Sequence, residues 1–286
     1  MPIKEYFKPD HLSQVQELIM SSTIPAKVSA GCTDLTIQLS QKASPPTRLI
    51  SLKNIPELPG VRESEAGDIF IGAAVSHADI AQSPLLLRWF PALAKASGLV
   101  AAPSIRNMAT IGGNICNASP SADTAPPLLA YNAKAIIRHS AGEKIIPVEK
   151  MFVGPSVSIL KTGEVLRGFV LKPQNGLIAD FEKLGIRKAM EIALVNVCIA
   201  IQLNDNNVCI KIRIALGAVA PTPMRAKKAE AKMAGKKISH ALIKETAATA
   251  MHEIAPITDI RASAGYRKKM VGALIEKILH HLSELA

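Results

Sequence analysis

The chain has 286 residues, of which 48% are hydrophobic and 20% are charged. This size and composition suit a globular protein with a sizeable core and two domains. No apolar run approaches the roughly 18 to 20 residues of a membrane-spanning helix. The N-terminus also lacks the charged and then apolar pattern of a secretory signal.

Four cysteines occur far apart, without a CxxC pair: Cys32, Cys116, Cys198 and Cys209. This spacing argues against a disulfide framework and against a zinc or iron–sulfur site made by this chain alone. A cytoplasmic, reducing environment is therefore expected.

The net charge of +11 lies almost entirely in residues 144–286. A basic half can indicate nucleic-acid binding. However, aromatic residues for base stacking make up only 3% of the chain, and the basic residues are mixed with a helical apolar pattern. A solvated basic face that docks an acidic partner subunit is the favoured interpretation, and no nucleic-acid partner is expected.

The first elements alternate between helix and strand. Residues 10–21 have the apolar spacing of an amphipathic helix, with Asp10 as its expected cap. A short strand at 26–30 then ends in a turn of small and polar residues at 31–34. A second helix, or a strand, follows through Leu39.

The middle of the chain contains strand-like runs at residues 49–52, 69–73, 135–138 and 164–170. Residues 75–99 are helical in pattern, with interruptions near Pro84 and Pro91. Residues 103–127 are rich in Gly, Asn, Ser, Thr and Pro, and such a long irregular stretch predicts a functional loop.

The last third begins after residues 172–176, which form the best candidate domain boundary. Strands at 193–203 and 208–218 are expected to form an antiparallel hairpin across Asp205, Asn206 and Asn207. Helices at about 225–234, 239–253 and 263–284 complete the chain.

Two loops have the composition of an anion site. Residues 29–35 follow a strand, and residues 109–114 contain Gly112 and Gly113. Glycine lets a phosphate approach the backbone, and consecutive N–H groups bind it without Lys or Arg. Thr33 and Thr110 add hydroxyl groups. Neither loop has the Rossmann or P-loop pattern, and each alone is more typical of an ordinary tight turn than of an anion site.

Four segments together resemble one family. Residues 30–35 (AGCTDL), 104–127, 181–188 (FEKLGIRK) and 259–267 (DIRASAGYR) are similar to segments of the FAD-binding medium subunits of molybdenum hydroxylases, the xanthine dehydrogenase and carbon monoxide dehydrogenase type. The resemblance extends from about residue 5 to about residue 281.

The resemblance implies an α+β fold in two parts. Residues 1–175 would form a two-lobed PCMH-type (vanillyl-alcohol oxidase-like) FAD-binding domain with two subdomains. Residues 176–286 would form a small α+β domain like the C-terminal domain of the CO dehydrogenase flavoprotein. Its expected core is a three-stranded antiparallel sheet with helices.

The resemblance also implies cofactor contacts in two pyrophosphate loops. The first loop consists of Val28, Ser29, Ala30, Gly31, Cys32, Thr33, Asp34 and Leu35. The second loop consists of Thr110, Ile111, Gly112, Gly113 and Asn114. No catalytic residue and no metal ligand is expected in this chain.

Four single residues complete the implied site. Asp123 matches an acidic residue at or near the adenosine part, and Lys183 matches a basic residue near the isoalloxazine. Leu166 matches an apolar contact to the flavin end or the adenine. Val100 lies where some members place an aromatic contact.

Each assignment has a structural alternative. Asp123 is also suited to capping the helix that follows it, and Lys183 to a solvated surface. Leu166 is expected to pack in the core whether or not it touches the cofactor. Arg106 is suited to holding its loop by hydrogen bonds, and His77, without ligand partners at useful spacing, is expected to be structural or exposed.

Cys32 departs from the family pattern, in which this position is commonly Gly. If the position needs a positive φ, a cysteine there costs about 1 kcal/mol. FAD binding is nevertheless expected to be retained, without a covalent bond between Cys32 and the flavin.

The implied function is electron transfer within a larger complex. FAD would be noncovalent, whereas molybdopterin and the [2Fe–2S] clusters would be carried by a large and a small partner subunit, in a dimer of heterotrimers. The acceptor (NAD+, a quinone, oxygen or another carrier) and the substrate (purine, N-heterocycle, aldehyde or CO) stay open. The alternative is a self-contained FAD-dependent oxidoreductase, although residues 176–286 contain no acid–base cluster for it.

Overall fold

The computed structural model describes residues 3–41, 47–187 and 189–285. The N-terminal lobe contains β1 (Ile3–Phe7), α1 (Leu12–Met20), β2 (Ala26–Ser29), α2 (Leu35–Gln41) and β3 (Thr47–Ser51). Its three strands form a parallel sheet in the order β1-β3-β2. The element that follows the 31–34 turn, α2, is thus a helix rather than a strand.

Helix α1 corrects one detail of the sequence interpretation. Because the helix begins at Leu12, the N-cap position belongs to His11, whose side chain makes no capping bond. Asp10 is therefore not the cap, and its N–H instead donates to Gln14 Oε1 at 3.0 Å. The helix is held by packing, since Leu12 and Val15 are buried in the main core.

The second lobe is built on an antiparallel sheet in the order β4-β5-β10-β6-β7. The strands are β4 (Val61–Glu63), β5 (Ile69–Gly72), β6 (Lys134–His139), β7 (Gly142–Pro147) and β10 (Val165–Leu171). A 3₁₀ turn, η1 (Val148–Met151), and a small pair, β8 (Phe152–Gly154) and β9 (Val157–Ser158), connect β7 to β10. Buried apolar residues of the central strands β5 and β10 form the sheet surface on which the helices of this lobe pack.

Six short helices occupy residues 77–130. They are α3 (His77–Gln82), α4 (Pro84–Trp89), α5 (Pro91–Gly98), α6 (Pro103–Arg106), α7 (Ile111–Cys116) and α8 (Ala125–Ala130). Pro84, Pro91 and Pro103 each open a helix, where the missing N–H costs nothing. The 103–127 stretch was expected to be irregular, but it contains α6, α7 and the start of α8, because prolines and a threonine cap start helices there.

The third sheet has the antiparallel order β11-β12-β13-β14. The strands are β11 (Leu177–Leu184), β12 (Val195–Leu203), β13 (Cys209–Gly217) and β14 (Met224–Arg225). The hairpin β12–β13 is confirmed. The sheet has four strands instead of the expected three, because a two-residue edge strand, β14, pairs with Ala215 and Leu216.

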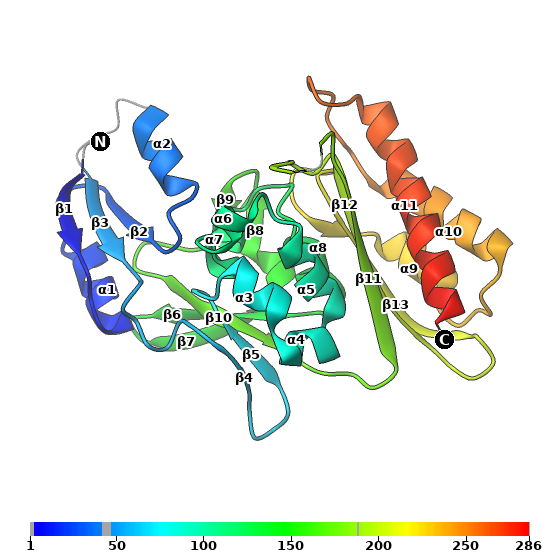
Figure 1. Cartoon of the computed structure of the whole chain (residues 1–286), viewed down its shortest axis with the longest axis horizontal. Coiled ribbons are helices and arrows are strands. Elements are labelled where there is room, and N and C mark those ends of the chain that lie inside the picture. The colour runs from blue at the N-terminus through cyan, green and yellow to red at the C-terminus, as the bar shows by residue number, and fades with distance from the viewer. Residues whose placement is uncertain (1–2, 42–46, 188, 286) are drawn as a thin grey trace.

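Helices α9 (Lys227–Met233), α10 (His240–Glu253) and α11 (Ala264–Glu284) cover one face of this sheet (Figure 1). The other face packs on α5 and α8. Alternate residues of β12 therefore enter different cores: Val197 and Ile199 face the helices α9–α11, whereas Cys198 and Ala200 face the second lobe. Burial on both faces explains why β12 reads as one continuous apolar run.

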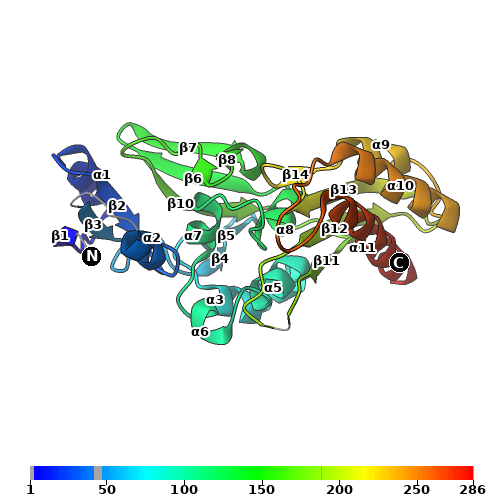
Figure 2. The same cartoon turned by 90° about the horizontal axis from the view of Figure 1, so that it is seen from above.

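Seen from above, the N-terminal lobe and the helices α9–α11 lie at opposite ends of an elongated molecule (Figure 2). The five-stranded sheet and its short helices lie between them (Figure 2). Among the described residues, no helix has the length and hydropathy needed to cross a bilayer.

Candidate functional site

The first predicted loop connects β2 to α2. Among the described residues, the N–H groups of residues 31–34 have no hydrogen-bond acceptor, whereas the Cys32 and Asp34 carbonyls begin α2 by accepting from Thr36 and Gln38. Cys32 has a φ of 60°, the left-handed conformation that turns successive N–H groups to one side. Such a concave run of free N–H groups is an anion site made of backbone alone.

The second predicted loop leads into α7. Thr110 caps this helix, since its Oγ1 accepts from Gly113 N at 3.1 Å. The N–H groups of Ile111 and Gly112 donate to the carbonyls of Val75 and Ala73. These N–H groups are therefore occupied within the protein, so the expectation of a second run of free N–H groups is wrong. What this loop exposes is the surface of Gly113.

Gly112 lies where no side chain fits. A Cβ on Gly112 would meet Ala73 O at 2.5 Å, so glycine lets α7 pack directly on the 73–75 backbone. This packing fixes the position of the second loop relative to the five-stranded sheet.

The two loops touch each other. A Cβ on Gly31 would come within 2.0 Å of Met108 O, so the first loop lies against the backbone that enters the second. Gln38 of α2 also donates to Asn117 Oδ1 at 3.4 Å, at the end of α7. The structure thus brings together two loops that are about 80 residues apart in the sequence (Figure 1). The free N–H groups of the first loop, with the second loop beside them, fit a pyrophosphate-containing cofactor.

A buried ion pair adjoins the second loop. Lys183 Nζ lies 2.6 Å from Asp123 Oδ2, and their side chains are 1% and 9% exposed. Lys183 also donates to the carbonyls of Leu99 at 3.1 Å and Glu191 at 3.2 Å. The alternative that Lys183 is a solvated surface residue is therefore wrong.

Asp123 is not a helix cap either. Its second oxygen, Oδ1, accepts from Asn196 Nδ2 at 3.0 Å, and the N-cap position of α8 belongs to Thr124. Burial raises the pKa of Asp123, against the opposing effects of Lys183 and Asn196. Thr124 Oγ1 donates to Asn114 Oδ1 at 2.6 Å, which joins this cluster to the second loop.

Val100 and Leu166 occupy different surroundings. Val100 lies in the turn after α5, where its carbonyl accepts from Arg106 Nη1 at 2.9 Å, so Arg106 does hold its loop by a hydrogen bond. Leu166 is 3% exposed within β10 and packs in the main core, as expected. Contact of either residue with the cofactor stays a prediction.

The remaining predicted residues lie around the first loop. Val28 and Ser29 end β2, and Ser29 Oγ donates to Ile50 O at 3.4 Å. Leu35 begins α2. Lys188, the last residue of the 181–188 motif, lies outside the described residues.

Sequence reasoning missed Asn196. This residue is fully buried in β12, opposite Lys183 in the strand register, and it orients Asp123. Its signal was present, because a single Asn inside an apolar strand must find a polar partner. However, nothing in the sequence pattern indicates which residue is the partner of Asn196.

The described residues show no metal site at the predicted cofactor residues, and the hollow against α1 lies elsewhere. Within residues 3–41, 47–187 and 189–285, no group of three or more His, Cys, Asp or Glu is placed to hold a metal ion. A hollow of about 350 Å³ lies against α1, away from both loops. Its lining consists of His11, Leu12, Ser13, Glu57, Arg138, Glu143 and Arg167.

Comparisons with known proteins identify the family of this chain. Residues 2–171 match the family described as FAD binding domain in molybdopterin dehydrogenase, and residues 181–282 match the CO dehydrogenase flavoprotein C-terminal domain. The chain is 30% identical over 263 residues to the xanthine dehydrogenase FAD-binding subunit of Escherichia coli O157:H7, covering 91% of this chain and 90% of that one. It is 30% identical over 280 residues to the carbon monoxide dehydrogenase medium chain of Hydrogenophaga pseudoflava, covering 98% and 96%.

The fold gives the same result. The solved carbon monoxide dehydrogenase from Hydrogenophaga pseudoflava superposes with a TM-score of 0.92 at 30% identity, over 98% of this chain and 96% of that chain. The chain therefore belongs to the family of FAD-binding subunits of molybdopterin dehydrogenases. It is an oxidoreductase subunit whose cofactor is FAD, and the resemblance noted from the sequence is confirmed.

Proposed function

We propose that this chain is the FAD-carrying electron-transfer subunit of a molybdenum hydroxylase, which receives electrons from the [2Fe–2S] clusters of a partner subunit and passes them to an acceptor such as NAD+ or a quinone. The observation that carries the proposal is the run of unbonded N–H groups at residues 31–34, pressed against the second loop. FAD, when bound, supplies the chemistry of accepting electrons and releasing them singly or as a hydride.

The residues of this chain hold and orient the cofactor in this proposal. The N–H groups of 31–34 and the Thr33 and Thr110 hydroxyls bind the pyrophosphate. The Lys183–Asp123 pair borders the flavin, and Lys183 holds this border in place because it donates to Asp123 Oδ2 and to the carbonyls of Leu99 and Glu191. Val100 and Leu166 supply apolar contacts.

The proposed assembly follows the relatives. Those relatives include medium chains of carbon monoxide and glyceraldehyde dehydrogenases. We assign this chain a large molybdopterin subunit and a small iron–sulfur subunit as partners, in a cytoplasmic dimer of heterotrimers. Within the chain, we place the boundary between the FAD-binding domain and the C-terminal domain at residues 172–176, between β10 and β11.

A glycine substitution tests the proposed pyrophosphate site. Gly31→Ala should abolish or strongly weaken FAD binding, because the new Cβ would overlap Met108 O and push the two loops apart. Gly154→Ala is the matched control, since a Cβ at Gly154 meets nothing within 4 Å. FAD affinity is measured by the quenching of flavin fluorescence on titration of each purified variant.

The proposal predicts normal FAD affinity for Gly154→Ala and a loss for Gly31→Ala without global unfolding in circular dichroism. A Gly31→Ala variant that binds FAD as tightly as the wild-type chain would place the pyrophosphate elsewhere.

A further inference from the structure

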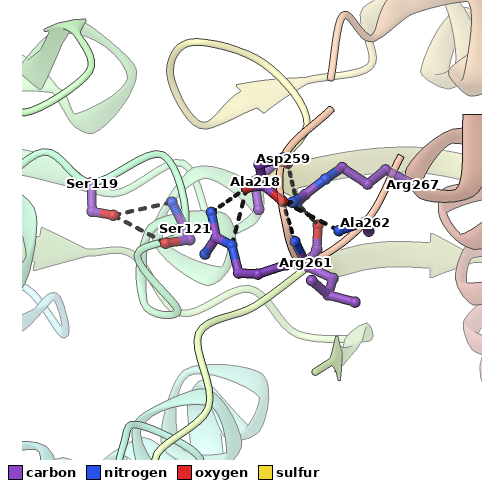
Figure 3. Close-up of polar contacts among 8 residues, drawn as sticks. Ser119, Ser121, Ala218, Asp259, Arg261, Ala262 and Arg267 are labelled. Carbon is purple, nitrogen blue, oxygen red and sulfur yellow. Dashed lines mark hydrogen bonds and ion pairs between the residues drawn. The ribbon is translucent and has the colours of Figure 1, made fainter. Parts of the chain in front are cut away.

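The 259–267 motif has a structural role that the cofactor contacts do not explain. Asp259 lies in the segment before α11, and its carboxylate accepts from Arg261 Nε at 3.0 Å and from Arg267 Nη2 at 2.9 Å (Figure 3). The N–H groups of Arg261 and Ala262 also donate to it. These bonds hold the pKa of Asp259 well below its usual range, with Arg261 contributing most. Asp259 thus accepts hydrogen bonds from two arginine side chains and two backbone N–H groups.

Arg267 extends from Asp259 into the protein. Its side chain is 2% exposed, although it comes from the first turn of α11. Its Nη1 donates to Leu194 O at 2.6 Å and faces Ala218 O at 3.4 Å. One guanidinium therefore joins α11 to the start of β12 and to the end of β13.

Those two strand ends border the cluster of Asp123, Lys183 and Asn196. Asn196 pairs with Gly217 in the register of β12 and β13, and a Cβ on Gly217 would meet Asn196 Oδ1 at 2.1 Å and Pro120 O at 3.3 Å. The Ala218 N–H donates to Pro120 O at 2.7 Å. The strand ends that Arg267 holds are thus pressed against the 119–123 segment.

Helix capping does not account for this arrangement. Ser263 already caps α11, since its Oγ accepts from Tyr266 N at 3.2 Å. Burying an arginine is costly unless its charge and its donors are partnered. Arg267 Nε lacks a partner among the described residues, so the hydrogen bonds that offset the burial of this side chain are those of its two Nη groups.

We propose that Arg267, anchored by Asp259, is a positioning residue for FAD. By fixing Leu194 and Ala218, it sets Asn196 and Pro120, and through Asn196 it sets the Asp123–Lys183 pair beside the flavin. The C-terminal domain thereby tunes the cofactor site of the FAD-binding domain without touching the cofactor. The proposal rests on the proposed function, because it requires FAD at the site described above.

The test compares two conservative variants with a matched control in the full-length chain. Arg267→Lys keeps the charge but loses the fork in which Nη2 donates to Asp259 while Nη1 contacts the carbonyls of Leu194 and Ala218. Asp259→Asn keeps an acceptor oxygen but loses the charge. Glu230→Gln is the control. Its carboxylate accepts from Arg225 Nε and Ile214 N at 2.9 Å, so it is a similar arginine-paired carboxylate in the same domain, without a bond to residues 119–123.

Three quantities are measured for each variant: FAD dissociation constant, midpoint potential of the bound flavin, and urea midpoint of the apoprotein. Arg267→Lys and Asp259→Asn should weaken FAD binding about tenfold, the effect of one lost charge-assisted hydrogen bond, and should shift the potential. Glu230→Gln should lower the urea midpoint and leave the FAD affinity and the potential unchanged.

Unchanged FAD affinity and potential in Arg267→Lys and Asp259→Asn would overturn the proposal. An equal loss of affinity in Glu230→Gln would also overturn it, since the effect would then be general destabilisation. A wild-type chain that takes up no FAD would instead refute the proposed function, so the two failures are distinguishable.

Discussion

At the residue scale, Cys32 is the clearest departure from the family pattern. The structure gives it a φ of 60°, so the condition for backbone strain is met. A side chain in this conformation costs about 1 kcal/mol relative to glycine, and a β-branched side chain costs more. The free thiol is half-buried, with its Sγ 3.7 Å from Ala30 O. Strain at a cofactor loop is consistent with a functional constraint on the loop shape.

This strain predicts an order of stabilities. Cys32→Gly should be as stable as the wild-type chain or more stable, whereas Cys32→Val should lose about 1–2 kcal/mol and bind FAD more weakly. Urea unfolding of the apoprotein measures the order. Cys209→Val in β13 is the control, because a β-branched residue suits an extended strand. A Cys32→Val variant that is more stable than Cys32→Gly would contradict the strain.

His77 predicts a pH dependence. His77 is fully buried at the start of α3, and its backbone N–H donates to Ala109 O, next to the second loop. Neither nitrogen of its imidazole ring has a partner among the described residues. Burial, and secondarily the Arg106 charge, lowers its pKa from 6.5 to about 4. The expectation that His77 is structural or exposed is therefore met by a buried, structural histidine.

The sign follows from the two pKa values. Between pH 6.5 and about pH 4, the unfolded chain binds a proton at His77 that the folded chain does not bind. Stability should therefore fall as the pH falls through this range, by about 3 kcal/mol in total. Urea unfolding at several pH values should show this slope of unfolding free energy against pH in the wild-type chain. In His77→Leu the slope should be smaller, by an amount equal to the uptake of about one proton on unfolding. Equal slopes in both proteins would contradict the assignment.

At the scale of elements, the sequence predicted what periodicity controls. The hairpin β12–β13 and the three C-terminal helices follow their apolar patterns closely, because each buries a face. The sequence pattern did not predict strand β11, because its residues Glu182 and Lys183 are charged. In the structure these two residues form ion pairs with Lys95 and Asp123 of the second lobe. Strands β1 and β7 alternate between partly buried and exposed residues, so they carry a weak apolar signal.

The sequence predicted which residues belong to the candidate site better than it predicted the hydrogen bonds and ion pairs between them. Gly31 and Thr110 carry the signal of their loops, yet only the folded chain shows that the first loop offers free N–H groups while the second has used its own. The partnership of Lys183 with Asp123 joins strands and loops 60 residues apart, and no local pattern encodes it. The resemblance supplied both residues, and the packing of the third sheet brings them together.

At the scale of the whole molecule, the third sheet is the structural link. Its two faces belong to different cores, so the FAD-binding lobes and the helices α9–α11 share one layer. Through Arg267, α11 is hydrogen-bonded to Leu194 and Ala218 at two strand ends, and the Ala218 N–H in turn donates to Pro120 O.

The central claim, that this chain holds noncovalent FAD, is tested most directly by the visible spectrum of the purified protein before and after acid precipitation. A noncovalently bound FAD should give flavin bands in the native protein, near one FAD per chain, and complete release of intact FAD into the supernatant. A colourless protein that fails to take up added FAD, or a flavin that stays with the precipitate, would contradict the central claim.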